Sequence, residues 1–295
     1  MLEFRRMVGD RLAIKPPEWG DDFLEYMRAS SAYVRRIDQW VQENPDEAKR
    51  LMAEAEARAV KEHDARIAER LKEHAAAKAA SAIPDLKRFL SEIGVGDVTR
   101  DAVLQSLDET DAMKAARAWT TKGGILLLLG AKGTGKTTAA AWALSQLGVT
   151  VWDRCFCDRC AGGGVRDDCF VAKDHPARVK DRVLSPMKAW FLKAGHMAAA
   201  LHRPRGEEIW ERARKVYALA IDDLGREYSD QHGRWLAELD LLIDDRHERR
   251  QPTVITSNLS PQEFIERYGE RIADRIRQMG LVVNCVGESL RRNRA

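Results

Sequence analysis

The stretch that decides the fold is Ile125-Leu-Leu-Leu-Leu-Gly130-Ala-Lys-Gly133-Thr-Gly135-Lys136-Thr137-Thr138. The apolar run predicts a strand that is buried on both faces, and a glycine-rich turn leads from it into an alanine-rich helix. The spacing Gly130-x4-Gly135-Lys136-Thr137 fits the phosphate-binding P-loop, in which backbone N–H groups surround an anion at a helix N-terminus. The alternative is a glycine turn before an ordinary helix.

The residues of this motif predict a nucleotide site that contains Mg²⁺. Lys136 is expected to reach the β- and γ-phosphates, and the Thr137 hydroxyl is expected to bind the metal ion. The other nucleotide contacts expected from the motif are Gly130, Lys132, Gly133, Thr134, Gly135 and Thr138.

A second apolar strand, Val216-Tyr-Ala-Leu-Ala-Ile221, ends in Asp222 and Asp223. Carboxylates placed there lie at the C-terminal edge of a parallel sheet, where open α/β folds bind ligands. Asp222 is expected to hold the Mg²⁺ shell, and Asp223 to orient or deprotonate the attacking water. Asn258 follows another buried strand and could hydrogen-bond the γ-phosphate or its water, unless it only forms a turn.

Length and charge limit the remaining classes of protein. A chain of 295 residues predicts one large domain with an extension. The formal charge of +3 is no nucleic-acid signature by itself. The basic end at Arg291 could touch phosphate locally, although a solvated terminus is the simpler interpretation.

The first twenty residues contain charges throughout and no apolar signal-peptide core. No apolar run approaches the roughly 18 residues that a membrane span needs. We therefore expect a cytoplasmic protein with no membrane partner.

The N-terminal part predicts two helices, Asp21 to Val41 and Asn44 to about Ala80. The second has only a thin apolar line, at Leu51, Val60, Ile67 and Leu71. It either packs on the first helix as a hairpin, is a solvated spacer, or docks another protein through exposed anchors. The anchors expected for docking are Trp19, Phe23 and Trp40.

Ala82-Ile83-Pro84 interrupts the helical pattern and predicts a domain boundary there. The predicted domains are 1–82, a helical extension that binds a partner, and 83–295. Short helices are expected at Pro84–Ile93 and Asp101–Trp119, ahead of the P-loop strand. A short strand is expected at Val149–Trp152 and another around Trp190.

Four cysteines crowd into a polar, glycine-containing insertion at 153–183. Cys157 and Cys160, two residues apart in a tight turn, would present both sulfurs to one Zn²⁺, and Cys169 with either Cys155 or His175 would complete a tetrahedral site. Free thiols in a reducing compartment or a redox pair are the alternatives. Cys285 is expected to be a buried strand residue.

The whole order of motifs resembles the DnaC/DnaI helicase loaders and the IstB transposition helpers, a clade of AAA+ ATPases. The resemblance covers about Ile83 to Arg292, interrupted by the cysteine insertion. It rests on the P-loop, Ala-Ile-Asp222-Asp223-Leu-Gly, Asp244-Asp245-Arg246 with Arg249-Arg250-Gln-Pro252-Thr, Thr256-Ser-Asn258-Leu, and Gly269-Glu-Arg271-Ile-Ala-Asp274-Arg275.

The resemblance implies a RecA-like parallel α/β sheet flanked by helices, and rings or spirals in which ATP lies between subunits. Lys136, Thr137, Asp222 and Asp223 match the Walker motifs, and Asn258 matches sensor 1. Arg275 matches the arginine finger that a neighbouring subunit offers to ATP, with Arg271 as a helper. Arg291 matches the sensor 2 position.

Two departures from the family pattern stand out. The second Walker B acid is Asp223 instead of glutamate, so turnover is expected to be slow or to need stimulation. The cysteine insertion is not part of the usual core, and the N-terminal helices lack the zinc-finger cysteines of the DnaI-type loaders.

The resulting hypothesis is an ATP-dependent loader of a hexameric replicative helicase that acts on single-stranded DNA. An IstB-like transposition helper shares every ATPase residue and differs only in its partner. A small-molecule kinase with a four-cysteine zinc lid and a nucleotide switch that does not hydrolyse ATP are the alternatives from other classes.

Overall fold

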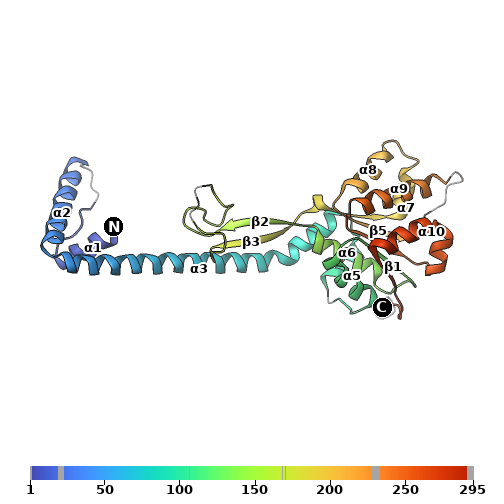
Figure 1. Cartoon of the computed structure of the whole chain (residues 1–295), viewed down its shortest axis with the longest axis horizontal. Helices are drawn as coiled ribbons and strands as arrows, with labels where there is room; N and C mark the ends of the chain where they lie inside the picture. Colours follow the sequence, from blue (N-terminus) through green and yellow to red (C-terminus); the bar gives the residue numbers. More distant parts are fainter. Residues whose placement is uncertain are drawn as a thin grey trace. The chain divides into compact units, whose positions relative to one another are not determined.

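The computed structural model describes residues 2–18, 23–105, 107–167, 169, 171–227 and 233–290 (Figure 1). The helices are α1 (Leu2–Arg11), α2 (Phe23–Glu43), α3 (Pro45–Glu92), α4 (Asp97–Leu104), α5 (Asp111–Lys122), α6 (Lys136–Leu147), η1 (Pro186–Lys188), α7 (Ala194–Ala200), α8 (Gly206–Lys215), α9 (Arg234–Glu248) and α10 (Pro261–Met279). The strands are β1 (Ile125–Leu129), β2 (Val149–Cys155), β3 (Arg178–Leu184), β4 (Ala189–Lys193), β5 (Ala218–Leu224), β6 (Thr253–Ser257) and β7 (Gly280–Asn284). Within the described residues, no helix combines the length and the apolar composition that a membrane span requires.

The chain divides into two compact units. The sheet unit consists of Lys78–Trp152 and Lys180–Ala295, and the cysteine unit consists of Met1–Ala77 and Asp153–Val179. We call Asp153–Val179 the cysteine segment. The structure thus groups this segment with the N-terminal helices, a grouping that the sequence did not suggest.

The sheet unit is built on a five-stranded parallel sheet in the order β4-β5-β6-β1-β7. Helices flank this sheet, as expected for a P-loop AAA+ fold (Figure 1). The strand that carries Asp222 and the P-loop strand are separated only by β6, so the ends of β5, β6 and β1 meet at one edge. The strand expected at Val149–Trp152 is present, but β2 pairs with β3 outside this sheet.

Side chains that alternate along the strands form two cores on the two faces of the sheet. Leu126 and Leu128 face one core, which contains Trp119 of α5, Leu144 of α6 and Phe89 of α3. The intervening residues of β1 face the other core, together with residues of α7, α8, α9 and α10. Both faces of β1 are buried, which explains its uninterrupted apolar run.

Arg246 of α9 closes one end of this sheet. Its side chain is fully buried, and Nη1 donates to the carbonyl oxygens of Ala213 and Val216, each at 2.8 Å. Nη2 donates to the carbonyls of Tyr217 and Pro252 at 3.1 and 2.8 Å. Burial lowers the pKa of Arg246 to about 9. The arginine of the Asp244-Asp245-Arg246 motif is therefore a structural residue that joins the starts of β5 and β6.

Two expectations about helices were wrong. Helix α3 continues through Pro84 to Glu92, because its last turns are held by Phe89 and Leu90 in the sheet core and tolerate the missing proline N–H. The helix expected at Asp101–Trp119 is two helices, α4 and α5. The division into domains at residue 82 stays a prediction, but the helix that contains it does not break.

The N-terminal helices of the cysteine unit form a small cluster of their own. Phe4 and Val8 of α1, Ile37 of α2 and Leu51 of α3 are buried together, so the start of α3 does pack on α2. Trp40 is half-buried against the same cluster and is not an exposed anchor. Trp19 and the side chain of Phe23 lie outside the described residues.

Two boundaries near the C-terminus differ slightly from expectation. The helix predicted to end at Gly269 is continued by a second helical piece, and Gly269 is a kink inside α10 with φ 82° and ψ 158°. The capping box at Ser260 and Glu263 is present. Cys285 is buried as expected, although β7 ends one residue before it.

Candidate functional site

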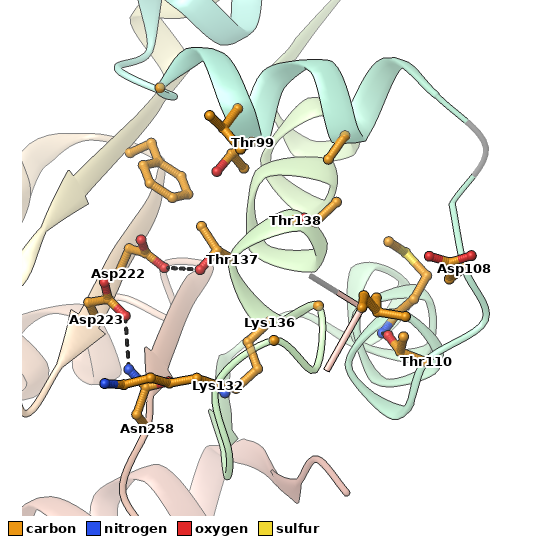
Figure 2. Close-up of a pocket in the computed structure, with 18 of the residues that line it drawn as sticks. Thr99, Asp108, Thr110, Lys132, Lys136, Thr137, Thr138, Asp222, Asp223 and Asn258 are labelled. Carbon is orange, nitrogen blue, oxygen red and sulfur yellow. Dashed lines mark hydrogen bonds between the residues drawn. The ribbon is translucent and has the colours of Figure 1, made fainter. Parts of the chain in front are cut away.

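A pocket of about 440 Å³ lies where the P-loop meets the ends of β5 and β6 (Figure 2). The predicted site residues that line it are Lys132, Gly133, Gly135, Lys136, Thr137, Thr138, Asp222, Asp223 and Asn258. Its opposite wall comes from α4, α5 and the segment between them, including Thr99, Asp108, Thr110 and Met113. One cavity therefore gathers the phosphate loop, both acids and the amide.

Two glycines of the loop adopt conformations that other residues rarely take. Gly130 has φ 111°, and a Cβ atom there would lie 2.5 Å from the Cys285 carbonyl oxygen. Gly133 has φ 88°, and a Cβ atom there would lie 2.1 Å from the Ser289 hydroxyl. The loop needs glycine at both places for backbone conformation and for space.

Lys136 is buried beneath the loop with 6% of its surface exposed. Its ammonium group donates to the carbonyls of Gly130 and Ala131 at 2.8 and 2.6 Å, and to the Thr134 hydroxyl at 3.3 Å. The loop thus holds the cation at the N-terminus of α6, where an anion is favoured. Gly130 and Thr134 belong to the site through these contacts.

Asp222 is the most buried acid of the pocket, with 2% of its surface exposed. Its Oδ1 accepts hydrogen bonds from the hydroxyls of Thr137, at 2.9 Å, and Thr256, at 2.7 Å (Figure 2 shows the first). Burial raises the pKa of the Asp222 carboxyl. A hydroxyl and a carboxylate converge here, which is the oxygen-only donor set that suits Mg²⁺.

Asp223 has a left-handed backbone conformation, with φ 58°, and the pairing of β5 with β6 shifts at this point. Its N–H donates to the Thr256 hydroxyl at 3.0 Å, and its Oδ1 accepts from the Asn258 amide at 3.1 Å (Figure 2). The Arg226 guanidinium lies 3.6 Å from Oδ2. Such strain in a non-glycine residue persists where neighbours fix it, and it turns this carboxylate into the pocket.

Sequence reasoning missed Arg226, Thr256 and Lys193 as residues of this site. Thr256 orients both acids, and its only sequence signal is its place two residues before Asn258 at the end of β6. Lys193 ends β4, pairs in register with Asp222 and lines the pocket. The wall from α4 and α5 carries no motif, so only the tertiary structure reveals it.

The predicted arginines lie elsewhere. Among the residues that the structure describes, those that line the pocket include neither Arg271 nor Arg275. Arg275 donates to Asp240 at 2.7 Å and pairs with Asp244 at 2.7 Å, while Arg271 lies 3.4 Å from Asp240 and is 68% exposed. They share one face of α10 as predicted, held by acids of α9. Arg291 lies outside the described residues.

The four clustered cysteines form a second candidate site, in the cysteine unit. The sulfur atoms of Cys155, Cys157, Cys160 and Cys169 lie within 4.8 Å of one another, and Cys155 and Cys169 are 3.8 Å apart. Four thiolates around one tetrahedral Zn²⁺ lie about 3.8 Å apart, given a Zn–S bond of about 2.3 Å. The residues therefore fit a four-cysteine metal site.

This geometry favours Cys155 over His175 as the fourth candidate ligand. Cys155 lies inside the sulfur cluster, and burial raises the pKa of its thiol to about 12. His175 instead accepts the Ala177 N–H at its Nδ1, at 3.1 Å. All five cysteines are free thiols, so the cluster is not a disulfide framework.

The cysteine segment packs on one stripe of α3. Ile67 is buried against the cysteines and Val171, and the ring of His74 lies 5.0 Å from that of Phe156. Asp158, between two of the cysteines, contacts His63 at 2.9 Å, Arg66 at 3.2 Å and Arg70 at 3.0 Å. Hydrogen bonds from His63 and Arg66 hold the pKa of Asp158 below its usual range.

The thin apolar line of α3 thus has partners within the chain. Leu51 joins the N-terminal cluster, Ile67 and Leu71 contact the cysteine segment, and Val60 is exposed. The prediction of a solvated spacer is wrong for these parts of the helix. The cysteine segment and the part of α3 up to Ala77 belong to the same compact unit.

No family model matches the sequence, and no curated protein matches it. Among solved structures, the chain is similar to DnaI, with a TM-score of 0.41 and 19% identity over 68% of this chain and 88% of that one. It is also similar to the DnaC helicase loader, with a TM-score of 0.39 and 17% identity over 65% and 92%. A third is domain III of the Thermotoga maritima replication initiation protein DnaA, with a TM-score of 0.39 and 19% identity over 67% and 66%.

Proposed function

We propose that this chain binds and hydrolyses ATP in the pocket at the C-terminal edge of its parallel sheet. The observation that supports this is the convergence of Lys136, Thr137, Asp222, Asp223 and Asn258 in one cavity. A glycine loop at a helix N-terminus, a buried lysine and two acids are the parts that phosphoryl transfer requires.

Each side chain has a distinct part in this proposal. The amides of the P-loop and the Lys136 ammonium bind the β- and γ-phosphates and stabilise charge on the transferring group. Asp223, with Asn258 against its carboxylate, holds the attacking water and accepts its proton. Thr137 and Asp222 would hold Mg²⁺, which supplies charge neutralisation at the phosphates.

Arg275 is proposed to act on ATP bound by a neighbouring subunit of a ring or spiral. Its side chain is 19% exposed and paired with Asp240 and Asp244, so it must exchange these partners for phosphate on assembly. Arg271 is the more exposed of the two and is proposed as its helper. Arg291 is proposed as a sensor of the nucleotide on the basis of the motif alone.

The cellular role proposed is that of a helicase loader in DNA replication. The order of motifs from the P-loop to Arg275 supports this, and among the similar structures one is titled the DnaC helicase loader. The N-terminal helices would bind a hexameric replicative helicase, and the ATP-bound assembly would hold single-stranded DNA. Hydrolysis would release the complex.

The cysteine cluster is proposed to bind structural Zn²⁺. Four buried or half-buried sulfurs with tetrahedral spacing support this, and so does the small number of apolar residues around them. The metal would hold the cysteine segment together and present it to α3.

The test combines ATP turnover with affinity capture. Purified protein with ATP, Mg²⁺ and single-stranded DNA should release phosphate, and Lys136→Ala and Asp223→Asn should each abolish it. ATP binding without turnover under all conditions would support the non-hydrolysing switch, and phosphate transfer to a nucleoside monophosphate would support the kinase.

Affinity capture from the native host with ATP should recover a replicative helicase. Recovery of a transposase would instead assign the same ATPase to transposition.

A further inference from the structure

Glu227 is a buried acid that the proposed chemistry does not use. It lies on the loop after β5, four residues beyond Asp223, and its side chain is fully buried. A buried carboxylate is costly unless hydrogen bonds satisfy it, so its partners indicate why it is there.

Its partners lie on its own loop and on α10, so Glu227 ties the β5 loop to that helix. Oε2 accepts the Gly225 N–H at 2.7 Å, and Oε1 accepts the Tyr268 hydroxyl at 2.5 Å. Arg267 donates to Oε1 through Nε and Nη2, at 3.2 and 3.1 Å, and Nη2 also reaches the Glu227 carbonyl at 2.9 Å. Burial, and then the carboxylate, raise the pKa of Tyr268, so its hydroxyl remains a donor.

The position of this cluster on α10 is the second observation. Arg267 and Tyr268 come immediately before the kink at Gly269, whose φ of 82° is not helical. Arg271 and Arg275 lie beyond the kink, in the second helical piece. Glu227 therefore grips the last residues of the first helical piece, next to the point where the second piece changes direction.

The first piece of α10 is also fastened to the pocket at its start. Asn258, which contacts Asp223, leads through Leu259 into the capping box at Ser260. The Ser257 hydroxyl donates to the Leu224 carbonyl at 2.5 Å. Residues 261–268 are thus attached at both ends to the loops around Asp223. The second piece is held by Ile272 and Ile276 in the sheet core and by the ion pairs of its arginines with α9.

We infer that Glu227 is a positioning residue that transmits the nucleotide state of the pocket to the arginine-bearing half of α10. The inference rests on the proposed binding of ATP. When the γ-phosphate enters, Asp223 and Asn258 must change partners, and the loop through Gly225 to Glu227 moves with them. Glu227 passes that movement to Tyr268 and Arg267, and through Gly269 it shifts the balance of the ion pairs that hold Arg271 and Arg275 on α9.

Hydrogen exchange tests this coupling without requiring hydrolysis or assembly. In the unmodified full chain, a non-hydrolysable ATP analogue with Mg²⁺ should slow exchange in the P-loop and change it in residues 270–279. Glu227→Gln should keep the P-loop response and reduce the response of residues 270–279 at least about fivefold, a typical coupling between sites. Glu266→Gln, at an exposed position of the same helix, should leave both responses as they are.

A second, milder variant keeps the test valid if Glu227→Gln does not fold. Tyr268→Phe removes one donor and keeps the Arg267 pair, so it should fold and lose part of the response of residues 270–279. If Glu227→Gln and Tyr268→Phe fold and both segments respond as in the unmodified chain, the inference is overturned while ATP binding stands. If the P-loop of the unmodified chain does not respond to the analogue, the proposed function fails and the inference fails with it.

Discussion

The nucleotide pocket and the cysteine cluster are both candidate ligand sites, but they are built in opposite ways. The pocket lies at the edge of a sheet whose strands are buried on both faces by aliphatic cores. The cysteine cluster is itself the centre of its small core, which otherwise contains Ile67, Val171 and Ala177 with a few half-buried neighbours. The pocket is supported by cores that do not include its ligand-binding side chains, whereas the cysteines are themselves most of the core around their site.

The two regions therefore differ in whether folding should depend on a bound ligand. The P-loop satisfies Lys136 with its own carbonyl oxygens, so the pocket holds its shape before a nucleotide binds. The four thiols lie close to one another at the spacing of a metal site, with Cys155 and Cys169 3.8 Å apart, and so small an apolar cluster contributes little burial energy. The nucleotide should change the state of a folded unit, whereas the metal should decide whether its unit folds.

The largest expected effect follows from removal of the metal ligands. Cys157→Ser should abolish stoichiometric zinc and unfold the cysteine segment, because structural Zn²⁺ contributes about 10 kcal/mol or more to such sites. Metal analysis and hydrogen exchange over residues 153–179 measure this. Cys285→Ser is the matched control, since that buried cysteine lies in the sheet unit and should leave the metal content unchanged. An unmutated protein that lacks zinc and still shows slow hydrogen exchange in the cysteine segment would contradict this difference between the two sites.

Replacement of Lys136 should have a large effect on ATP binding and a small effect on the stability of the sheet unit. Lys136→Ala should weaken ATP binding by about 100-fold, through loss of about 3 kcal/mol of charge-assisted contacts. The melting temperature of the sheet unit should change by only a few degrees. Calorimetric titration and thermal melting test both parts, with exposed Lys122→Ala as the control. Unfolding of the sheet unit in the Lys136 variant would mean that the fold of the P-loop depends on the Lys136 ammonium group.

A smaller effect is expected at Thr256, which donates to Asp222 and accepts from Asp223. Thr256→Val removes this hydroxyl at nearly constant volume and should weaken Mg²⁺-dependent ATP binding about fivefold, the equivalent of about 1 kcal/mol. Thr256→Ser should retain it. Equal affinities for the two variants, measured by nucleotide titration with and without Mg²⁺, would show that the acids are held without the hydroxyl.

The smallest effect should come from the contact between the cysteine segment and α3. Asp158 is partly exposed, so Asp158→Asn should cost only about 0.5 kcal/mol and leave zinc in place. Exchange in residues 153–179 should quicken about twofold, which mass spectrometry detects. Asp174→Asn changes another exposed acid of the same segment and is the control. Loss of zinc in the Asp158 variant would mean that α3 helps to form the site.

Local motifs explain which parts of the fold could be predicted. The P-loop, the acids after β5 and the capping box of α10 are each defined by neighbours within a few residues, and the structure has them where they were expected. The end of α3 could not be predicted in this way. Pro84 is a local stop signal, but Phe89 and Leu90 pack into the sheet core and keep the helix continuous.

Short spacings place the glycines of the P-loop, the acids after β5 and the pair Cys157 and Cys160 in one turn or at one strand end. These candidate ligand residues could therefore be predicted from the sequence. The contacts between distant segments could be seen only once the chain was folded. Folding brought Thr256 between the two acids, Asp158 onto α3, Cys155 in place of His175 into the sulfur cluster, and Glu227 onto α10. A side chain's partner across tens of residues depends on the packing of whole helices and strands, and no local spacing in the sequence records that packing.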